Sequence, residues 1–220
     1  YPDTFFEGCT SGGLRLDMEV LRHFDGHFLS DNVNPTDYIR IYEQALLRLP
    51  PGRLTKWVAL RSVGKTIVQY GLSIEKTPTA VVTPASCGAI WEKSETVSVD
   101  FATRVAMAGM PGFTGDIASL TDQEKQRLAK HVEFYKKWQK FIVGSKAHLL
   151  TVPKLKNDHL GWAAIQLQHP CQKDSLLFAY RLDDACHERI FQLRGLDANA
   201  VYSVANEDKA GEKPQQLTGK

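Results

Sequence analysis

The chain has 220 residues, of which 43% are hydrophobic and 24% charged, as is ordinary for a globular protein. The formal charge of +2 is too small to indicate binding to nucleic acid or to an anionic membrane surface. No run approaches the roughly 18 apolar residues that a membrane-spanning helix needs. We therefore expect neither nucleic acid nor a membrane as a partner.

Short strands alternate with helices over the first two thirds of the chain. A capping box at Thr121–Glu124 opens one helix, and Asn34-Pro35 opens another. The segment at about 64–96 has the weakest periodicity and is predicted to be a long insertion with one short strand pair. The predicted strands are 4–8, 27–30, 57–60 and 110–117, and the predicted helices are 16–22, 34–49, 97–107 and 121–144.

After Lys146 the helical periodicity ends. Runs of four to eight residues alternate with turn residues, which is typical of antiparallel strands. The predicted strands are 147–152, 161–168, 175–182, 189–193 and 200–204.

Polar residues follow the first two predicted strands. Residues 5–17 read FFEGCTSGGLRLD, and residues 28–32 read FLSDN. In a parallel α/β barrel, the carboxyl ends of neighbouring strands meet at one edge and build the active site. The glycine spacing fails both G-x-G-x-x-G and the P-loop, which argues against a nucleotide site. From the residues alone, ordinary turn chemistry at Gly12-Gly13 and a capping role for Asp31 remain open.

This stretch resembles the C-S-S-G-G-G-R-x-D signature, and the S-D acid/base that follows it, of the melibiases, the α-galactosidases of glycoside hydrolase family 36. The interval from Cys9 to Asp31 also matches. The resemblance implies that Asp31 is the general acid/base, and that Cys9 and Gly12 bind sugar hydroxyls near C2. The sequence departs from the signature at Thr10, where the family usually has Ser, and at Leu14, where it usually has a third Gly. The bulk of the Leu14 side chain can narrow the turn.

The fold implied by the resemblance is α/β: the second half of a (β/α)8 TIM barrel, followed by a small antiparallel β-sandwich domain. Residues 1–146 would be strands five to eight of the catalytic barrel, and residues 147–220 the β domain. The implied protein is a retaining exo-glycosidase that hydrolyses terminal α-galactosyl residues. A retaining mechanism needs two carboxyl groups about 5 Å apart. The resemblance places the nucleophile aspartate upstream, outside this chain, so we expect the chain to be an inactive piece of a longer enzyme.

The expected partner is an α-galactoside oligosaccharide or a glycoconjugate, with no metal or organic cofactor. Three questions stay open: whether the sugar is galactose or N-acetylgalactosamine, whether the reaction is hydrolysis or transglycosylation, and whether the protein is a homo-oligomer. A different class of function, a non-catalytic carbohydrate-binding or structural relative of the same fold, is favoured by Leu14 and by the Asn-Val-Asn-Pro that follows Asp31.

Further candidates come from the same regions. Arg15 either pairs with Asp17 to hold the loop or orients the acid/base carboxyl and the sugar. Arg61 ends a barrel strand and is preferred to Trp57 as a sugar contact, while Trp91 in the insertion is a candidate for the leaving-group side.

Asp116 is interpreted as structural or as a rim residue. The four cysteines, Cys9, Cys87, Cys171 and Cys186, lack metal-ligand spacing. They are expected to be reduced, with Cys171 and Cys186 as one possible pair.

Overall fold

The computed structural model describes residues 1–62, 80–84, 94–171, 173–209 and 211–219. Two compact units make up the chain, Tyr1–Arg189 and Ile190–Lys220. Trp91 and Cys87, both in the predicted insertion, lie outside the described residues.

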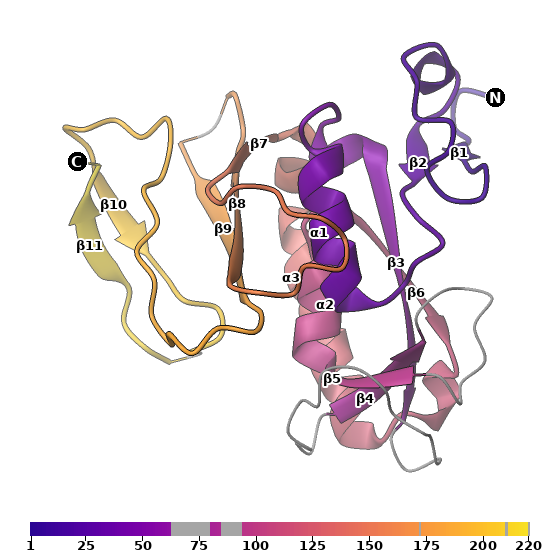
Figure 1. Ribbon diagram of the computed structural model, residues 1–220. Helices are drawn as coiled ribbons and strands as arrows, with labels where there is room; N and C mark the ends of the chain where they lie inside the picture. The colour runs from indigo at the N-terminus through magenta and orange to yellow at the C-terminus, as the bar shows by residue number, and fades with distance from the viewer. Residues whose placement is uncertain (63–79, 85–93, 172, 210, 220) are drawn as a thin grey trace. The chain divides into compact units, whose positions relative to one another are not determined.

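Four parallel strands form the main part of the larger sheet of the first unit. They are β1 (Glu7–Gly8), β2 (Gly26–Phe28), β3 (Leu54–Ser62) and β6 (Met110–Gly115). β1 pairs with β2, β2 with β3, and β3 with β6, each in parallel. The four strands predicted from the sequence are therefore present and lie side by side (Figure 1).

A hairpin extends the carboxyl end of β3. β4 (Ala80–Pro84) pairs antiparallel with β3, and β5 (Ser94–Ser98) pairs antiparallel with β4. This hairpin is the short strand pair that the sequence predicted within the insertion.

Three α-helices, α1 (Pro35–Ala45), α2 (Val99–Met107) and α3 (Asp122–Gly144), lie on one side of β3 and β6 (Figure 1). Each begins at a side-chain cap, and α3 has the predicted capping box. The predicted helix at 16–22 is instead a single 3-10 turn, η1 (Val20–Arg22), and two further 3-10 turns are η2 (Pro51–Arg53) and η3 (Ile117–Ser119). Among the described residues no helix is both long and apolar enough to cross a membrane.

The two faces of β3 differ because side chains alternate along a strand. Leu54, Val58 and Leu60 point towards the helices and are fully buried in two hydrophobic clusters. Lys56 shares this face, donates to the Val105 carbonyl and lies 3.5 Å from the centre of the Tyr42 ring. Burial lowers the pKa of the Lys56 ammonium well below its usual value.

A second sheet packs against α1 in the same unit. It consists of the antiparallel strands β7 (Lys146–Leu149), β8 (Trp162–Gln168) and β9 (Ser175–Arg181). Ile165 and Leu167 of β8 are fully buried and share a hydrophobic cluster with Tyr38 and Tyr42 of α1. The domain boundary predicted after residue 146 stays a prediction, and the compact unit itself continues to Arg189.

The second unit contains one antiparallel strand pair, β10 (Val201–Val204) and β11 (Gln215–Thr218). The sequence predicted β10 but not β11. The strand predicted at 189–193 is not formed, and Ile190 is 97% exposed.

Candidate functional site

The parallel register of β1 and β2 brings two of the predicted site residues to one edge of the sheet. Gly8 lies opposite His27, so Cys9 follows β1 where Phe28 ends β2. The chain then continues beside β3, where the Leu29 amide donates to the Thr55 carbonyl at 3.2 Å. Cys9 and the Ser30–Asp31 segment therefore leave the sheet at the same end.

The turn after Cys9 is tight and rests on the segment that carries Asp31. The Thr10 amide donates to the Gly12 carbonyl at 3.2 Å, and Gly12 has a φ of +74°. A Cβ at Gly12 would lie 2.8 Å from the Asp31 amide nitrogen and 2.8 Å from Ser30 Cα. Only glycine fits this contact. Leu14 is 76% exposed, so its bulk points to solvent.

The Asp31 side chain is exposed, but the residues after it are fixed. The Asn32 amide donates to Ser30 Oγ at 3.1 Å, and the Asn34 amide donates to Asn32 Oδ1 at 2.9 Å. Asn34 Oδ1 in turn accepts from the Thr36 amide at 2.9 Å and caps α1. The exposed Asp31 carboxyl is thus followed by a segment whose backbone is fixed by hydrogen bonds.

The β4–β5 hairpin also bonds to this loop, at Val33 and Asn34. Thr83 Oγ1 donates to the Val33 carbonyl at 3.3 Å, and Asn34 Nδ2 donates to Glu95 Oε2 at 2.5 Å. Burial raises the pKa of the Glu95 carboxyl, and the bond from Asn34 offsets part of that rise. Sequence reasoning missed Glu95 and Thr83 because they lie in the segment interpreted as an insertion.

Arg61 and Trp57 lie on the face of β3 opposite to the helices. The half-buried Trp57 ring covers Gly112 of β6, because a Cβ at Gly112 would lie 2.4 Å from it. Arg61 is paired across the sheet with Val82 of β4, next to Thr83. Arg61 therefore sits at the end of the sheet where the 30–34 loop passes.

Arg15 is exposed beyond the Gly12 turn. Among the described residues, no hydrogen bond or ion pair joins Arg15 to Asp17 or to Asp31. Asp17 instead caps η1, since its Oδ1 accepts from the amides of Glu19 and Val20, both at 3.0 Å. The bond from Val20 is the main cause of the lowered pKa of the Asp17 carboxyl.

Asp116 also caps a 3-10 turn, since its side chain accepts from the Ser119 amide at 3.2 Å. Cys9, Cys171 and Cys186 are free and exposed thiols. Within the described ranges, no three His, Cys, Asp or Glu side chains are grouped so that they could hold a metal ion.

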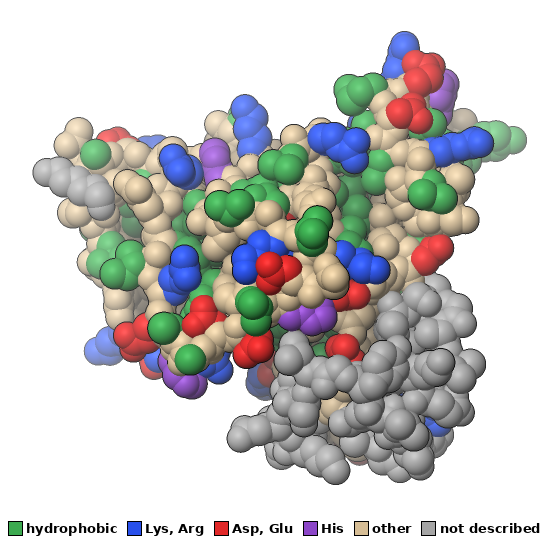
Figure 2. All heavy atoms as spheres, in the orientation of Figure 1, with side chains coloured by type: hydrophobic (Ala, Val, Ile, Leu, Met, Phe, Trp, Pro, Cys, Tyr) green, Lys and Arg blue, Asp and Glu red, His purple; other side chains and the backbone are tan. Residues whose placement is uncertain are grey.

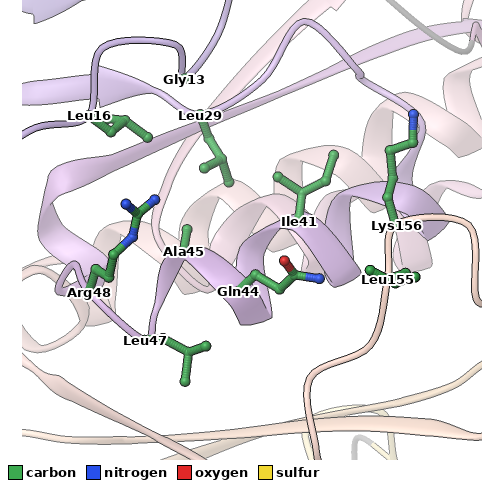
Figure 3. A pocket seen from close by; sticks show the side chains of 10 residues that line it. All are labelled: Gly13, Leu16, Leu29, Ile41, Gln44, Ala45, Leu47, Arg48, Leu155 and Lys156. Atoms are coloured by element: carbon green, nitrogen blue, oxygen red, sulfur yellow. The ribbon is translucent and has the colours of Figure 1, made fainter.

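A separate crevice of about 590 Å³ lies between the Gly13–Leu16 turn, α1 and the 155–156 segment (Figure 3). Aliphatic side chains such as Leu29, Ile41 and Ala45 line it, with Arg48 among the few polar ones. Cys9, Gly12 and Asp31 are not part of its lining. A sugar site needs several polar groups that bond to the sugar hydroxyls, so this mainly aliphatic crevice is not assigned as the sugar site.

On the face shown in Figure 2, the described residues form no large region of one charge. Lys and Arg side chains are interspersed with acidic and hydrophobic ones (Figure 2). This agrees with the small net charge of +2.

Known α-galactosidases resemble this chain in sequence. No family model matches the chain. The probable α-galactosidase C of Aspergillus flavus is 27% identical over 207 residues, which is 93% of this chain and 23% of that protein. The bifunctional α-galactosidase/sucrose kinase AgaSK of Mediterraneibacter gnavus is 26% identical over 92% of this chain and 18% of its own length.

Solved structures agree in fold. The α-galactosidase AgaA of Geobacillus stearothermophilus, of glycoside hydrolase family 36, superposes with a TM-score of 0.73 at 23% identity, covering all of this chain and 26% of that one. The galactosidase domain of AgaSK gives a TM-score of 0.71 at 24% identity, with the same coverage.

The chain is similar to the family 36 α-galactosidases over nearly its whole length. The resemblance predicted from residues 5–32 is confirmed, and the proteins it resembles are glycoside hydrolases. The chain spans about a quarter of the length of the curated relatives that it matches.

Proposed function

We propose that this chain is part of a retaining α-galactosidase in which Asp31 is the general acid/base. The observation that carries the proposal is the seating of the Gly12 turn against the Ser30–Asp31 backbone, at the ends of β1 and β2. It joins the two halves of the sequence signature, and the similarity to α-galactosidases supports it.

In this proposal the four parallel strands are strands five to eight of a (β/α)8 barrel. The helix-free face of β3, with Trp57 and Arg61, then faces the barrel interior. Residues 147–220 are the β domain, a β-sandwich in the complete protein. The coverage of all of this chain by the AgaA structure, against 26% of AgaA, supports this assignment.

The chemistry uses two steps. A nucleophile aspartate, on a segment that this chain does not contain, attacks the anomeric carbon while Asp31 delivers a proton to the departing oxygen. Asp31 then removes a proton from the water that hydrolyses the glycosyl-enzyme. Cys9 and Gly12 contact sugar hydroxyls near C2, and Arg61 is a further sugar contact. Arg15 orients the acid/base carboxyl or the sugar.

The proposed substrate is a terminal α-galactoside of an oligosaccharide or glycoconjugate. Substituted forms of AgaA have been solved in complex with raffinose and with stachyose. Raffinose is therefore the natural substrate to test first.

The test is Asp31→Asn in the full-length protein. Asn keeps the shape but cannot deliver a proton, so we expect kcat/KM for raffinose to fall about 10²–10⁴-fold. An activated nitrophenyl α-galactoside needs little protonation, so its first step should survive better. Azide, a nucleophile that needs no base, should restore part of the nitrophenyl turnover.

The matched control is Asp174→Asn, an exposed carboxylate in the turn between β8 and β9. It should leave both rates unchanged. Equal losses on both substrates at Asp31→Asn, without azide rescue, would contradict the acid/base role. No turnover by the unmodified full-length protein would favour the non-catalytic carbohydrate-binding relative.

A further inference from the structure

Asn32, the residue after Asp31, is bonded to a carboxylate–histidine pair. Asn32 Nδ2 donates to Asp37 Oδ2 at 2.6 Å, and the other oxygen, Asp37 Oδ1, lies 2.5 Å from His159 Nε2. Asp37 is in the first turn of α1, whereas His159 lies in the segment between β7 and β8. The Asp37 side chain is 19% exposed and that of His159 is 26% exposed, so water competes weakly for these bonds.

The backbone on both sides of His159 is held by a buried arginine. Arg40 of α1 donates from Nε to the Asp158 carbonyl at 2.9 Å and from Nη2 to the Leu160 carbonyl at 2.8 Å. It also pairs with Glu43 at 2.8 Å, and neither side chain of this ion pair is exposed. A buried guanidinium is costly unless its donors are satisfied, so the chain cannot easily move away at either neighbour of His159.

The result is a continuous set of contacts that ends at the Asp31 backbone. Arg40 fixes the segment, His159 meets Asp37, Asp37 accepts from Asn32, and Asn32 adjoins Asp31. Gly12 packs directly against the Asp31 amide nitrogen. The Asp31 side chain itself makes none of these bonds and stays exposed.

We propose that His159 is a positioning residue for Asp31, acting through Asp37 and Asn32. The proposal rests on the proposed acid/base role of Asp31. Proton delivery to a leaving oxygen tolerates a misplacement of only about 0.5 Å, whereas binding of the sugar to other residues tolerates more. His159 therefore affects the proton-transfer step more than sugar binding.

A double-mutant cycle in the full-length protein tests this, with His159→Ala, Asp31→Asn and the combination. We expect His159→Ala to lower kcat/KM for raffinose about 10- to 100-fold, and to lower it much less for a nitrophenyl α-galactoside. Added to Asp31→Asn, it should cause no further loss on raffinose, because no proton remains to be positioned.

A conservative variant and a control variant make the test more specific. His159→Gln keeps an N–H group that can reach Asp37 and should recover most of the raffinose activity. His148→Ala is the matched control, since His148 is a half-buried imidazole on β7 that bonds to Gln168 at 3.1 Å. It should change neither rate by more than about twofold.

The outcomes separate the two proposals. Equal losses on both substrates at His159→Ala, or a loss that multiplies with that of Asp31→Asn, would make His159 a structural tether and overturn the positioning role alone. Equal losses at Asp31→Asn itself would overturn both proposals. If His159→Ala yields no folded protein, the same cycle with Asp37→Ala, which removes both contacts of the carboxylate, decides, with the same selective loss expected.

Discussion

Gly12 is where the conformation of one residue controls the position of another that is distant in sequence. Its φ of +74° disfavours any side chain, and a Cβ would press on Ser30 Cα and on the Asp31 amide. The sequence marked Gly12 as a turn residue. It could not show that the turn rests on Ser30–Asp31, because that contact depends on the pairing of β1 with β2.

Replacing Gly12 by Ala should therefore disturb Asp31. In the full-length protein we expect Gly12→Ala to lower kcat/KM for raffinose about 10- to 100-fold. Gly211→Ala is the control, since Gly211 also has a positive φ, +104°, but a Cβ there would meet nothing within 4 Å. A loss no larger than that of the control would show that the contact with Asp31 is unimportant.

At the scale of elements, α2 and α3 are joined by a polar clamp around Asp100. Asp100 Oδ1 accepts from Arg127 Nε at 3.0 Å, and Oδ2 accepts from Arg127 Nη2 at 2.5 Å. His131 Nε2 lies 2.6 Å from the same Oδ1. Burial would raise the pKa of the Asp100 carboxyl, but the bonds from His131 and Arg127 outweigh it and hold that pKa well below its usual value.

The lowered pKa predicts how stability depends on pH. A carboxyl whose pKa is depressed in the folded state stabilises the protein above its unfolded pKa of about 3.9. This contribution is lost as the pH falls below that value towards the folded pKa. Asp100→Asn should therefore lower the free energy of unfolding by about 2 kcal/mol at pH 7, and by progressively less below pH 4. Chemical denaturation of both proteins at pH 7 and below pH 4 measures the loss. An equal loss under both conditions would contradict an ionic origin of the stabilisation by Asp100.

The elements that the sequence predicted best are those with local signals. The capping box of α3 and the Asn34 cap of α1 mark helix starts correctly, because a cap involves neighbours in the chain. β11 was missed because Gln215–Thr218 has no buried face and becomes a strand only by pairing with β10. The 189–193 run has strand-like residues but no partner strand in the described structure.

At the scale of the whole molecule, the parallel sheet ends abruptly on both sides. Among the described residues, β1 pairs only with β2, and β6 pairs only with β3. Unpaired edges of this kind are normally covered or paired in a stable protein.

The family resemblance could be recognised from residues 5–32. The contacts by which Glu95 and His159 support the loop after Asp31 could not be predicted, since both residues lie far from the signature in sequence.

This chain produced alone should not cleave α-galactosides. Under the proposed function it lacks the nucleophile, so no glycosyl-enzyme can form on it. We expect no release of nitrophenol from a nitrophenyl α-galactoside above the buffer rate, with the full-length protein as the positive control. Turnover by the isolated chain that Asp31→Asn abolishes would refute the assignment of the nucleophile to another segment.

The buried Arg40 has a consequence for recombination between relatives. Its guanidinium belongs to α1, but the Asp158 and Leu160 carbonyls that satisfy it lie beyond residue 146. A crossover at that point would inherit the charge from one parent and its acceptors from the other. Exchange of the β7–β9 sheet is therefore compatible only with parents that share this arrangement, so α1 and the 150–162 segment are constrained to be inherited together.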